Sequence, residues 1–178
     1  YDYIINGLKL LQNRGYDSAG ISYIYQNKIE TIKYASTSTN NSLDILETNI
    51  NTNEQSHIAI GHTRWATHGP KTNENAHPHL SNNKDFSIVH NGIIENFQQL
   101  KNELLEEGYT FHSQTDTEVI CILLEKFYKN TSCIQTSIEN TIQMLQGTWA
   151  LVIIHTNYPD QIWLTRNGSP LLLGLDEN

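Results

Sequence analysis

The chain has 178 residues, of which 38% are apolar and 17% charged, and its formal net charge is −8. This length and composition predict one globular domain with a single core and argue against disorder. No apolar run is long enough to cross a bilayer, so we expect a cytoplasmic protein that does not bind membranes. The eleven basic residues are spread along the chain and do not form the clustered basic surface that nucleic-acid binding requires.

The first third of the sequence predicts a helix, a β-hairpin and a polar loop. Apolar residues at helical spacing within residues 4–11 predict an amphipathic helix. Two β-rich runs, 21–25 and 29–34, are separated by three polar residues, which is typical of a hairpin. The polar stretch 35–55 is expected to form a surface loop with one short helix near residues 43–46.

The rest of the sequence predicts strands in two blocks with helices between them. In chain order we expect strands at 57–62 and 86–90, helices at 96–107, 117–127 and 134–145, and strands at 149–154, 161–165 and 171–173. In the first of these helices, Leu100, Leu104 and Leu105 are expected on one face, and Gly108 marks its end. The grouping of the strands predicts an α+β fold with antiparallel sheets.

The densest polar segment, residues 61–69, follows a predicted strand. Its arginine, Arg64, can hold a carboxylate through two parallel hydrogen bonds, and Thr67 can add a third donor. The alternative is a surface loop that carries an incidental arginine.

A second candidate segment contains Asn91 and Gly92. Asn-Gly after a strand is typical of a hairpin turn, but a helical pattern follows instead of a second strand. The side-chain N–H of Asn91 and the backbone N–H of Gly92 can form an oxyanion hole for a tetrahedral intermediate. A glycine also lets a substrate approach the backbone closely.

A third segment precedes the helix predicted at 117–127. Thr115 and Glu118 have the spacing of a capping box, in which Thr115 caps the helix and Glu118 reaches back. Asp116 is then in the first turn, where the helix dipole stabilises its carboxylate and where it can pair with a substrate ammonium. A cation for a carboxylate, an anion for an ammonium and two oxyanion donors together describe a site for an amino-acid amide.

Five histidines fall close together in the sequence, which raises the question of a metal. They are His62, His68, His77, His79 and His90. No cysteine pair and no His-Glu-x-x-His helix accompanies them, so we expect no metal site, and a metal-dependent hydrolase is the least favoured hypothesis. Cys121 and Cys133 lie in or beside helical patterns and are expected to be reduced and mostly buried.

Several long motifs resemble those of one known family. They are Arg-Gly-Tyr-Asp-Ser-Ala-Gly at 14–20, the segment 61–69, Asn-Ala-His-Pro-His at 75–79, the segment 90–96, Thr-Asp-Thr-Glu at 115–118 and Arg-Asn-Gly-Ser-Pro at 166–170. The chain resembles the class II glutamine amidotransferases, and in particular the glutaminase domains of the glutamine–fructose-6-phosphate aminotransferase family, also called glucosamine-6-phosphate synthases. The resemblance implies an N-terminal nucleophile hydrolase-like four-layer sandwich, with two antiparallel sheets between helical layers.

The resemblance implies roles for the same residues in binding L-glutamine. Arg64 and Thr67 hold the α-carboxylate, with help from backbone groups near Trp65 and His68, and Asp116 takes the α-ammonium. Trp65 belongs to a loop that closes over glutamine and gates ammonia.

The same resemblance assigns the oxyanion hole to Asn91 and Gly92 and requires no cofactor. The resemblance also implies that Arg14 and Asp17 form a structural ion pair that supports the loop beside the nucleophile. His77 is expected behind the residues that touch substrate, and its role stays open.

The nucleophile of this family is an N-terminal cysteine whose own α-amino group is the general base. The printed chain begins at Tyr1, and neither Cys121 nor Cys133 has a free α-amino group. We therefore expect residues 1–178 to be an amidotransferase domain truncated at both ends, without the isomerase domains and inactive by itself.

The resemblance further implies that the full-length enzyme is a homo-oligomer. It passes ammonia to fructose-6-phosphate through the isomerase domains. The main alternative is a non-catalytic, amidotransferase-like remnant that binds an amino acid or a protein partner.

Overall fold

A computed structural model of the chain describes residues 2–51, 56–66 and 69–175. Its helical segments are α1 (Asp2–Leu11), the 3₁₀ turn η1 (Gln12–Arg14), α2 (Ser42–Asn49), α3 (Phe97–Glu106), α4 (Thr117–Thr131) and α5 (Ile134–Met144). Its strands are β1 (Ser18–Tyr25), β2 (Lys28–Ala35), β3 (Ala59–Arg64), β4 (His79–Leu80), β5 (Phe86–Ile94), β6 (Gly147–His155) and β7 (Trp163–Asn167).

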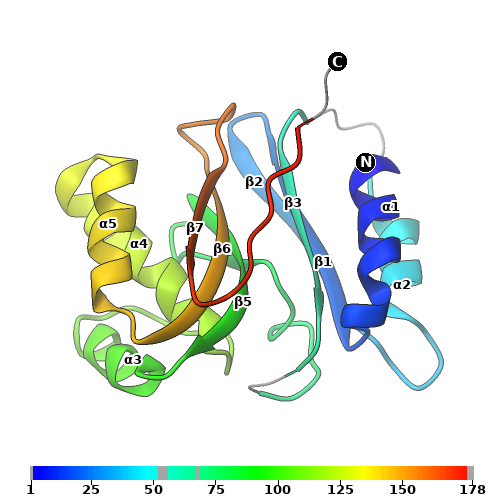
Figure 1. The fold of residues 1–178 in the computed structure, drawn as a ribbon, viewed down its shortest axis with the longest axis horizontal. Helices are drawn as coiled ribbons and strands as arrows, with labels where there is room; N and C mark the ends of the chain where they lie inside the picture. The colour runs from blue at the N-terminus through cyan, green and yellow to red at the C-terminus, as the bar shows by residue number, and fades with distance from the viewer. Residues whose placement is uncertain (1, 52–55, 67–68, 176–178) are drawn as a thin grey trace.

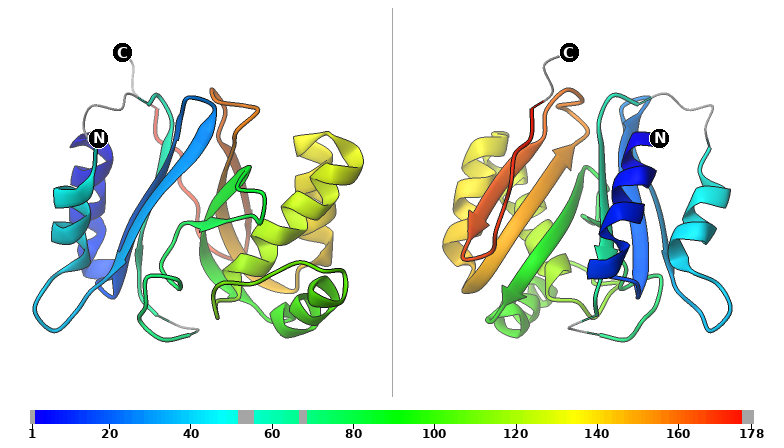
Figure 2. Two further views of the ribbon diagram at one scale, coloured as in Figure 1. Left: turned by 180° about the vertical axis from the view of Figure 1, so that it is seen from behind. Right: turned by 45° about the vertical axis from the view of Figure 1, so that its right-hand side comes forward.

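The elements form four layers (Figure 1). One sheet has the order β2-β1-β3 and the other the order β4-β5-β6-β7, and every pairing between named strands is antiparallel. Helices α1 and α2 cover the outer face of the first sheet, and α3, α4 and α5 lie outside the second (Figures 1 and 2). The predicted α+β sandwich of two antiparallel sheets between helical layers is confirmed.

Three apolar clusters hold these layers together. The cluster between α3–α5 and the second sheet includes Phe86, Leu104 and Ile120, each at most 1% exposed. A smaller cluster, which includes Leu8 and Leu46, joins α1 and α2 to the first sheet. The third lies between the two sheets and consists of Ile24, Ile29, Ile58, Ile60, Val89 and Ile154.

The first hairpin closes with a tight two-residue turn. Gln26 and Asn27 both have positive φ, 48° and 59°, as a type I′ turn requires. This turn matches the twist of the strands and sets the register Tyr25↔Lys28. The predicted hairpin and the short helix near 43–46 are confirmed, although β1 already begins at Ser18.

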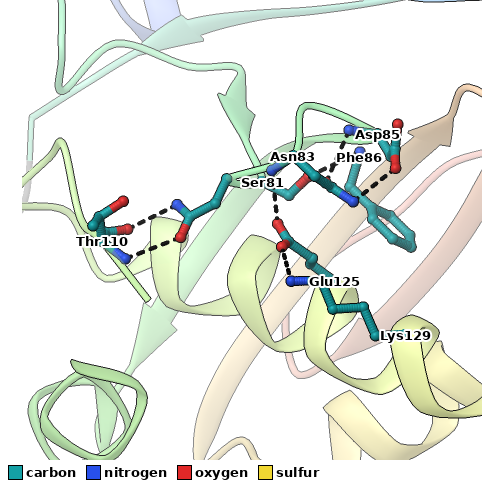
Figure 3. Close-up of polar contacts among 8 residues, drawn as sticks. Ser81, Asn83, Asp85, Phe86, Thr110, Glu125 and Lys129 are labelled. Carbon is teal, nitrogen blue, oxygen red and sulfur yellow. Dashed lines mark hydrogen bonds and ion pairs between the residues drawn. The ribbon is translucent and has the colours of Figure 1, made fainter. Parts of the chain in front are cut away.

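A buried carboxylate fixes the turn that leads into β5 (Figure 3). Glu125 of α4 is 2% exposed; it accepts the backbone N–H of Asn83 at 3.0 Å and pairs with Lys129. The Asn83 side chain in turn accepts the hydroxyl of Ser81 and donates to Asp85. The turn is thereby tied to α4, and β5 enters the sheet in a fixed register.

The structure corrects several sequence-based predictions. Leu105 lies on the exposed side of α3, with 48% of its surface exposed, whereas Leu100 and Leu104 are buried as predicted. Residues 171–173 form no strand, and Leu172 is 94% exposed. The short strand β4 was not predicted. None of the helices in the described part of the chain is long and apolar enough to cross a membrane.

Two neighbouring leucines of α3 provide a matched test of this packing. Leu104→Ala should lower the free energy of unfolding by about 2–5 kcal/mol because it leaves a cavity between α3 and the second sheet. Leu105→Ala should change it by less than about 0.5 kcal/mol, since this side chain faces solvent. Urea unfolding of both variants measures the difference, and equal losses would contradict the orientation of α3.

Candidate active site

The predicted site residues meet around one small polar cavity between the two sheets. The cavity has a volume of about 200 Å³. Its walls come from the end of β3, the middle of β5 and the start of α4, and its lining residues are Arg14, His62, Thr63, Arg64, Trp65, His77, His90, Asn91, Gly92, Thr115, Asp116 and Thr117. Every predicted site residue that the structure describes therefore borders the same space.

Arg64 is the last residue of β3 and is only 4% exposed. The strand pairing Ser18↔Arg64 fixes its backbone, and its guanidinium donates to the Pro70 carbonyl at 3.5 Å. Burial lowers the pKa of Arg64 from its usual value, while the charges of Asp17 and Asp116 oppose that shift. A guanidinium stays charged under these conditions and gives this wall of the cavity a fixed positive charge.

Asp116 stands directly before α4 and is 4% exposed. Its carboxylate accepts the backbone N–H of Ile94 at 2.8 Å, which ties the start of α4 to β5. The predicted capping box is wrong in its partners. Glu118 reaches further back, to the N–H groups of His112 and Ser113, and thereby holds the segment that carries Asp116.

Asn91 and Gly92 lie inside β5 and not in a turn after it. They pair with Ala150 and Trp149 of β6, so the strand passes through the site and continues to Ile94. Gly92 has a φ of +142°, and a side chain there would collide with the Thr148 carbonyl. Only glycine fits this position, and its backbone is open to the cavity.

Trp65 follows β3 and is 59% exposed at the edge of the cavity. Its ring meets that of Tyr16 edge to face, with ring centroids 5.5 Å apart. Thr67 and His68, which the sequence also assigned to the site, lie outside the described residues.

The predicted ion pair between Arg14 and Asp17 is wrong. Asp17 instead pairs with Lys71 and accepts the backbone N–H of Ala66 at 2.9 Å. Burial alone would raise the pKa of Asp17, but these two contacts outweigh it and lower the pKa below its usual value. Asp17 thus fixes the chain directly after Arg64.

The histidines form a packed group around the cavity, and His62, His77 and His90 line it. His77 and His90 both contact the hydroxyl of Thr117, at 3.0 and 2.9 Å, and His79 contacts that of Thr115 at 3.0 Å. Burial lowers the pKa of His77, His79 and His90. These rings are therefore neutral at pH 7.

Lys33 supports the site although the sequence analysis did not identify it, because a lysine in a strand usually faces water. Its ammonium donates to the carbonyls of Glu74, Ala76 and Pro78, at 3.2, 2.7 and 3.0 Å. Burial lowers the pKa of Lys33 to about 8. This cation holds the segment that presents His77.

The two cysteines lie elsewhere. Cys121 is buried in α4, and burial raises its pKa well above the usual value, so its thiol is inert. Cys133 is exposed, contrary to the expectation that both are mostly buried. Within the described residues, no group of three or more His, Cys, Asp or Glu side chains is arranged to hold a metal ion.

A larger cavity of about 670 Å³ lies between α1 and β3. Its lining is mainly apolar and includes Ile4, Leu8 and Ile58. Of the predicted site residues that the structure describes, none borders this larger cavity.

Comparison with known proteins agrees with this geometry. Residues 62–177 match the glutamine amidotransferase domain family. The chain is 44% identical over 176 residues to the probable glutamine–fructose-6-phosphate aminotransferase (isomerizing) of Acanthamoeba polyphaga mimivirus. It is also 44% identical over 175 residues to the enzyme of that name from Pyrococcus horikoshii. Each alignment covers 98% of this chain but 28% of the relative.

A solved structure shows the same architecture. Glutamine phosphoribosylpyrophosphate amidotransferase from B. subtilis superimposes with a TM-score of 0.67 and 30% identity, over 85% of this chain and 32% of that one. The chain belongs to the glutamine amidotransferase domain family. The resemblance inferred from its motifs, to the domain found in glutamine–fructose-6-phosphate aminotransferases, is confirmed.

The buried histidines predict a loss of stability in mild acid. The pKa of His155, which is 0% exposed, is lowered by burial to about 4, and the pKa values of His77 and His79 shift in the same direction. Between about pH 6.5 and 4 the unfolded chain therefore binds more protons than the folded chain, and the free energy of unfolding falls as the pH falls. Each unit of pKa depression contributes about 1.4 kcal/mol.

Urea unfolding across this pH range measures how steeply the free energy of unfolding depends on pH. His155→Phe should make this dependence weaker, whereas His57→Phe, at an exposed position, is the control and should leave it unchanged. A free energy of unfolding that does not vary between pH 7 and 4.5 would contradict the neutral, buried state of these rings.

Proposed function

We propose that the cavity binds L-glutamine and hydrolyses its side-chain amide to glutamate and ammonia. Arg64 binds the α-carboxylate, Asp116 binds the α-ammonium, and Trp65 covers the bound amino acid. The side-chain N–H of Asn91 and the backbone N–H of Gly92 stabilise the oxyanion that forms at the amide carbon. Thr67 and His68 complete the α-carboxylate site in this proposal.

The observation that carries the proposal is the meeting of opposite charges in one small space. A buried guanidinium and a buried carboxylate border a cavity of about 200 Å³ that also exposes Asn91 and Gly92. A free amino acid carries both a carboxylate and an ammonium, so this pair of charges fits its backbone. The oxyanion donors lie on β5, where the side-chain amide would reach them.

The nucleophile is proposed to be an N-terminal cysteine of the parent protein, as in the family. The lining residues that the structure describes include Thr63, Thr115 and Thr117 but no cysteine. The thiolate attacks the amide carbon, ammonia leaves, and water then cleaves the thioester to release glutamate. The 178-residue chain without that cysteine is expected to bind glutamine but not to turn it over.

We further propose that residues 1–178 are the amidotransferase domain of a longer, homo-oligomeric enzyme. The chain spans 28% of the length of the curated relatives it matches, and these are named for the transfer of nitrogen to fructose-6-phosphate. In that enzyme the isomerase domains would use the released ammonia to make glucosamine-6-phosphate.

Two charge-removing variants of the full-length parent protein test the binding roles. Arg64→Ala and Asp116→Ala should each raise the KM for glutamine by roughly tenfold to a hundredfold, because a charge-assisted contact contributes about 1.5–3 kcal/mol. Arg166→Ala and Asp44→Ala, at exposed positions away from the cavity, are the matched controls. Wild-type KM in both cavity variants would refute these assignments.

Asn91→Ala tests the oxyanion role separately. Removal of one oxyanion donor should lower kcat for glutamine hydrolysis by about a hundredfold or more and leave KM nearly unchanged. Ammonia release under saturating glutamine measures this effect. An unchanged kcat would show that Asn91 does not face the developing charge.

The alternative is a non-catalytic domain that binds an amino acid or a protein partner. Titration of the parent protein with glutamine, followed by an ammonia assay, distinguishes the two. Binding without ammonia release would favour the non-catalytic domain, whereas release that disappears in Asn91→Ala supports the enzyme.

A further inference from the structure

His62 lies on β3, opposite the Asn91 side chain of β5. Its Nε2 atom is 3.0 Å from Oδ1 of Asn91, and this hydrogen bond joins the two sheets at the cavity. Both residues border the cavity. The proposed function gives His62 no role, although it stands next to the proposed oxyanion donor.

The direction of this hydrogen bond follows from the chemistry of the Asn91 amide. Its Oδ1 atom is a carbonyl oxygen, which can only accept a hydrogen bond. The proton at this contact therefore sits on Nε2 of His62. Nε2–H of His62 therefore donates to Oδ1 of Asn91. Burial lowers the pKa of His62 to about 4, so the ring keeps this single proton at pH 7.

This contact sets which end of the Asn91 amide faces the cavity. An asparagine amide can rotate by half a turn at little cost unless a partner distinguishes its oxygen from its nitrogen. With Oδ1 held by His62, the Nδ2 donors are left for the cavity, and the described residues offer Nδ2 no hydrogen bond. The opposite rotamer would present a carbonyl oxygen to the oxyanion and repel it.

The His62 ring is itself held in place from behind. It stacks on the ring of His77, with centroids 4.4 Å apart and planes at 29°. Nε2 of His77 contacts the Thr117 hydroxyl, and Lys33 anchors the carbonyls on both sides of His77. These contacts restrict the plane of the donor that reaches Asn91.

We propose that His62 is a positioning residue for amide hydrolysis: its Nε2–H fixes the Asn91 side chain with its N–H groups aimed at the reacting carbonyl. This proposal rests on the proposed function, because it requires Asn91 to be an oxyanion donor. It assigns His62 an effect on the transition state and not on glutamine binding.

His62→Phe in the full-length parent protein is the main test. Phenylalanine keeps a ring that can stack on His77 but removes the donor. We expect kcat to fall by roughly tenfold to a hundredfold, as for other small displacements of a catalytic group, and KM to stay within about twofold. His62→Gln, whose amide nitrogen can replace Nε2–H, should recover most of the lost rate. His57→Phe, an exposed histidine just before β3, is the matched control.

A double variant separates positioning from general damage. In an Asn91→Ala background, His62→Phe should cause no further loss of kcat, because the group that it orients is gone. If His62→Phe does not fold, His62→Asn replaces it, since its shorter amide does not reach Asn91.

Two results would overturn the proposal: a wild-type kcat in the variant without the donor, or an equal loss in both backgrounds. If Asn91→Ala itself has wild-type kcat, the oxyanion assignment of the proposed function fails instead.

Discussion

The site depends on the close approach of β3 and β5, which belong to different sheets. Apolar residues between the sheets, among them Ile60 and Val89, hold the two layers together. Beyond this apolar region the facing side chains become polar, and the hydrogen bond between His62 and Asn91 bridges the gap. The cavity exists because the sheets stay packed while their polar ends leave room for a ligand.

The same constraint explains why so many polar groups are buried without large net charge. Arg64 is accompanied by the carboxylates of Asp17 and Asp116, and burial keeps the surrounding histidines neutral. An uncompensated charge in this region would cost several kcal/mol, so the arrangement is stable only when each ion has a counterpart or a set of dipoles. Bound glutamine, with its own pair of charges, would fit this balance.

Much of the fold could be predicted from the sequence. Alternation and helical spacing identified the hairpin and the helices, and the grouping of strands indicated an α+β fold with antiparallel sheets. That there are two sheets between helical layers followed from the family resemblance. The errors have local physical causes. Leu105 has the right spacing for the buried face of α3 but lies one position beyond it. Residues 171–173 are apolar, but they form no strand and the side chains of Leu172 and Leu173 face solvent. β4 has two residues, too few for any pattern.

The site was predicted through its motifs, but its supporting residues were not. Asn91-Gly92 has the composition of a turn, yet the strand continues through it because β6 pairs with every residue of β5. Lys33 and Lys71 act through contacts distant in sequence, so a single strand or loop gives no sign of them. The contact of Asp17 with Ala66 is likewise distant in sequence, whereas Glu118 binds N–H groups only five and six residues before it, beyond the spacing of a capping box.

A crystal structure of the intact parent protein with bound glutamate, the proposed reaction product, tests most directly whether this cavity binds glutamine in the proposed orientation. We expect the α-carboxylate to contact Arg64, the α-ammonium to contact Asp116, and the side-chain carboxylate to lie against Nδ2 of Asn91 and the backbone N–H of Gly92. Glutamate bound elsewhere, or in the reverse orientation in this cavity, would contradict this expectation.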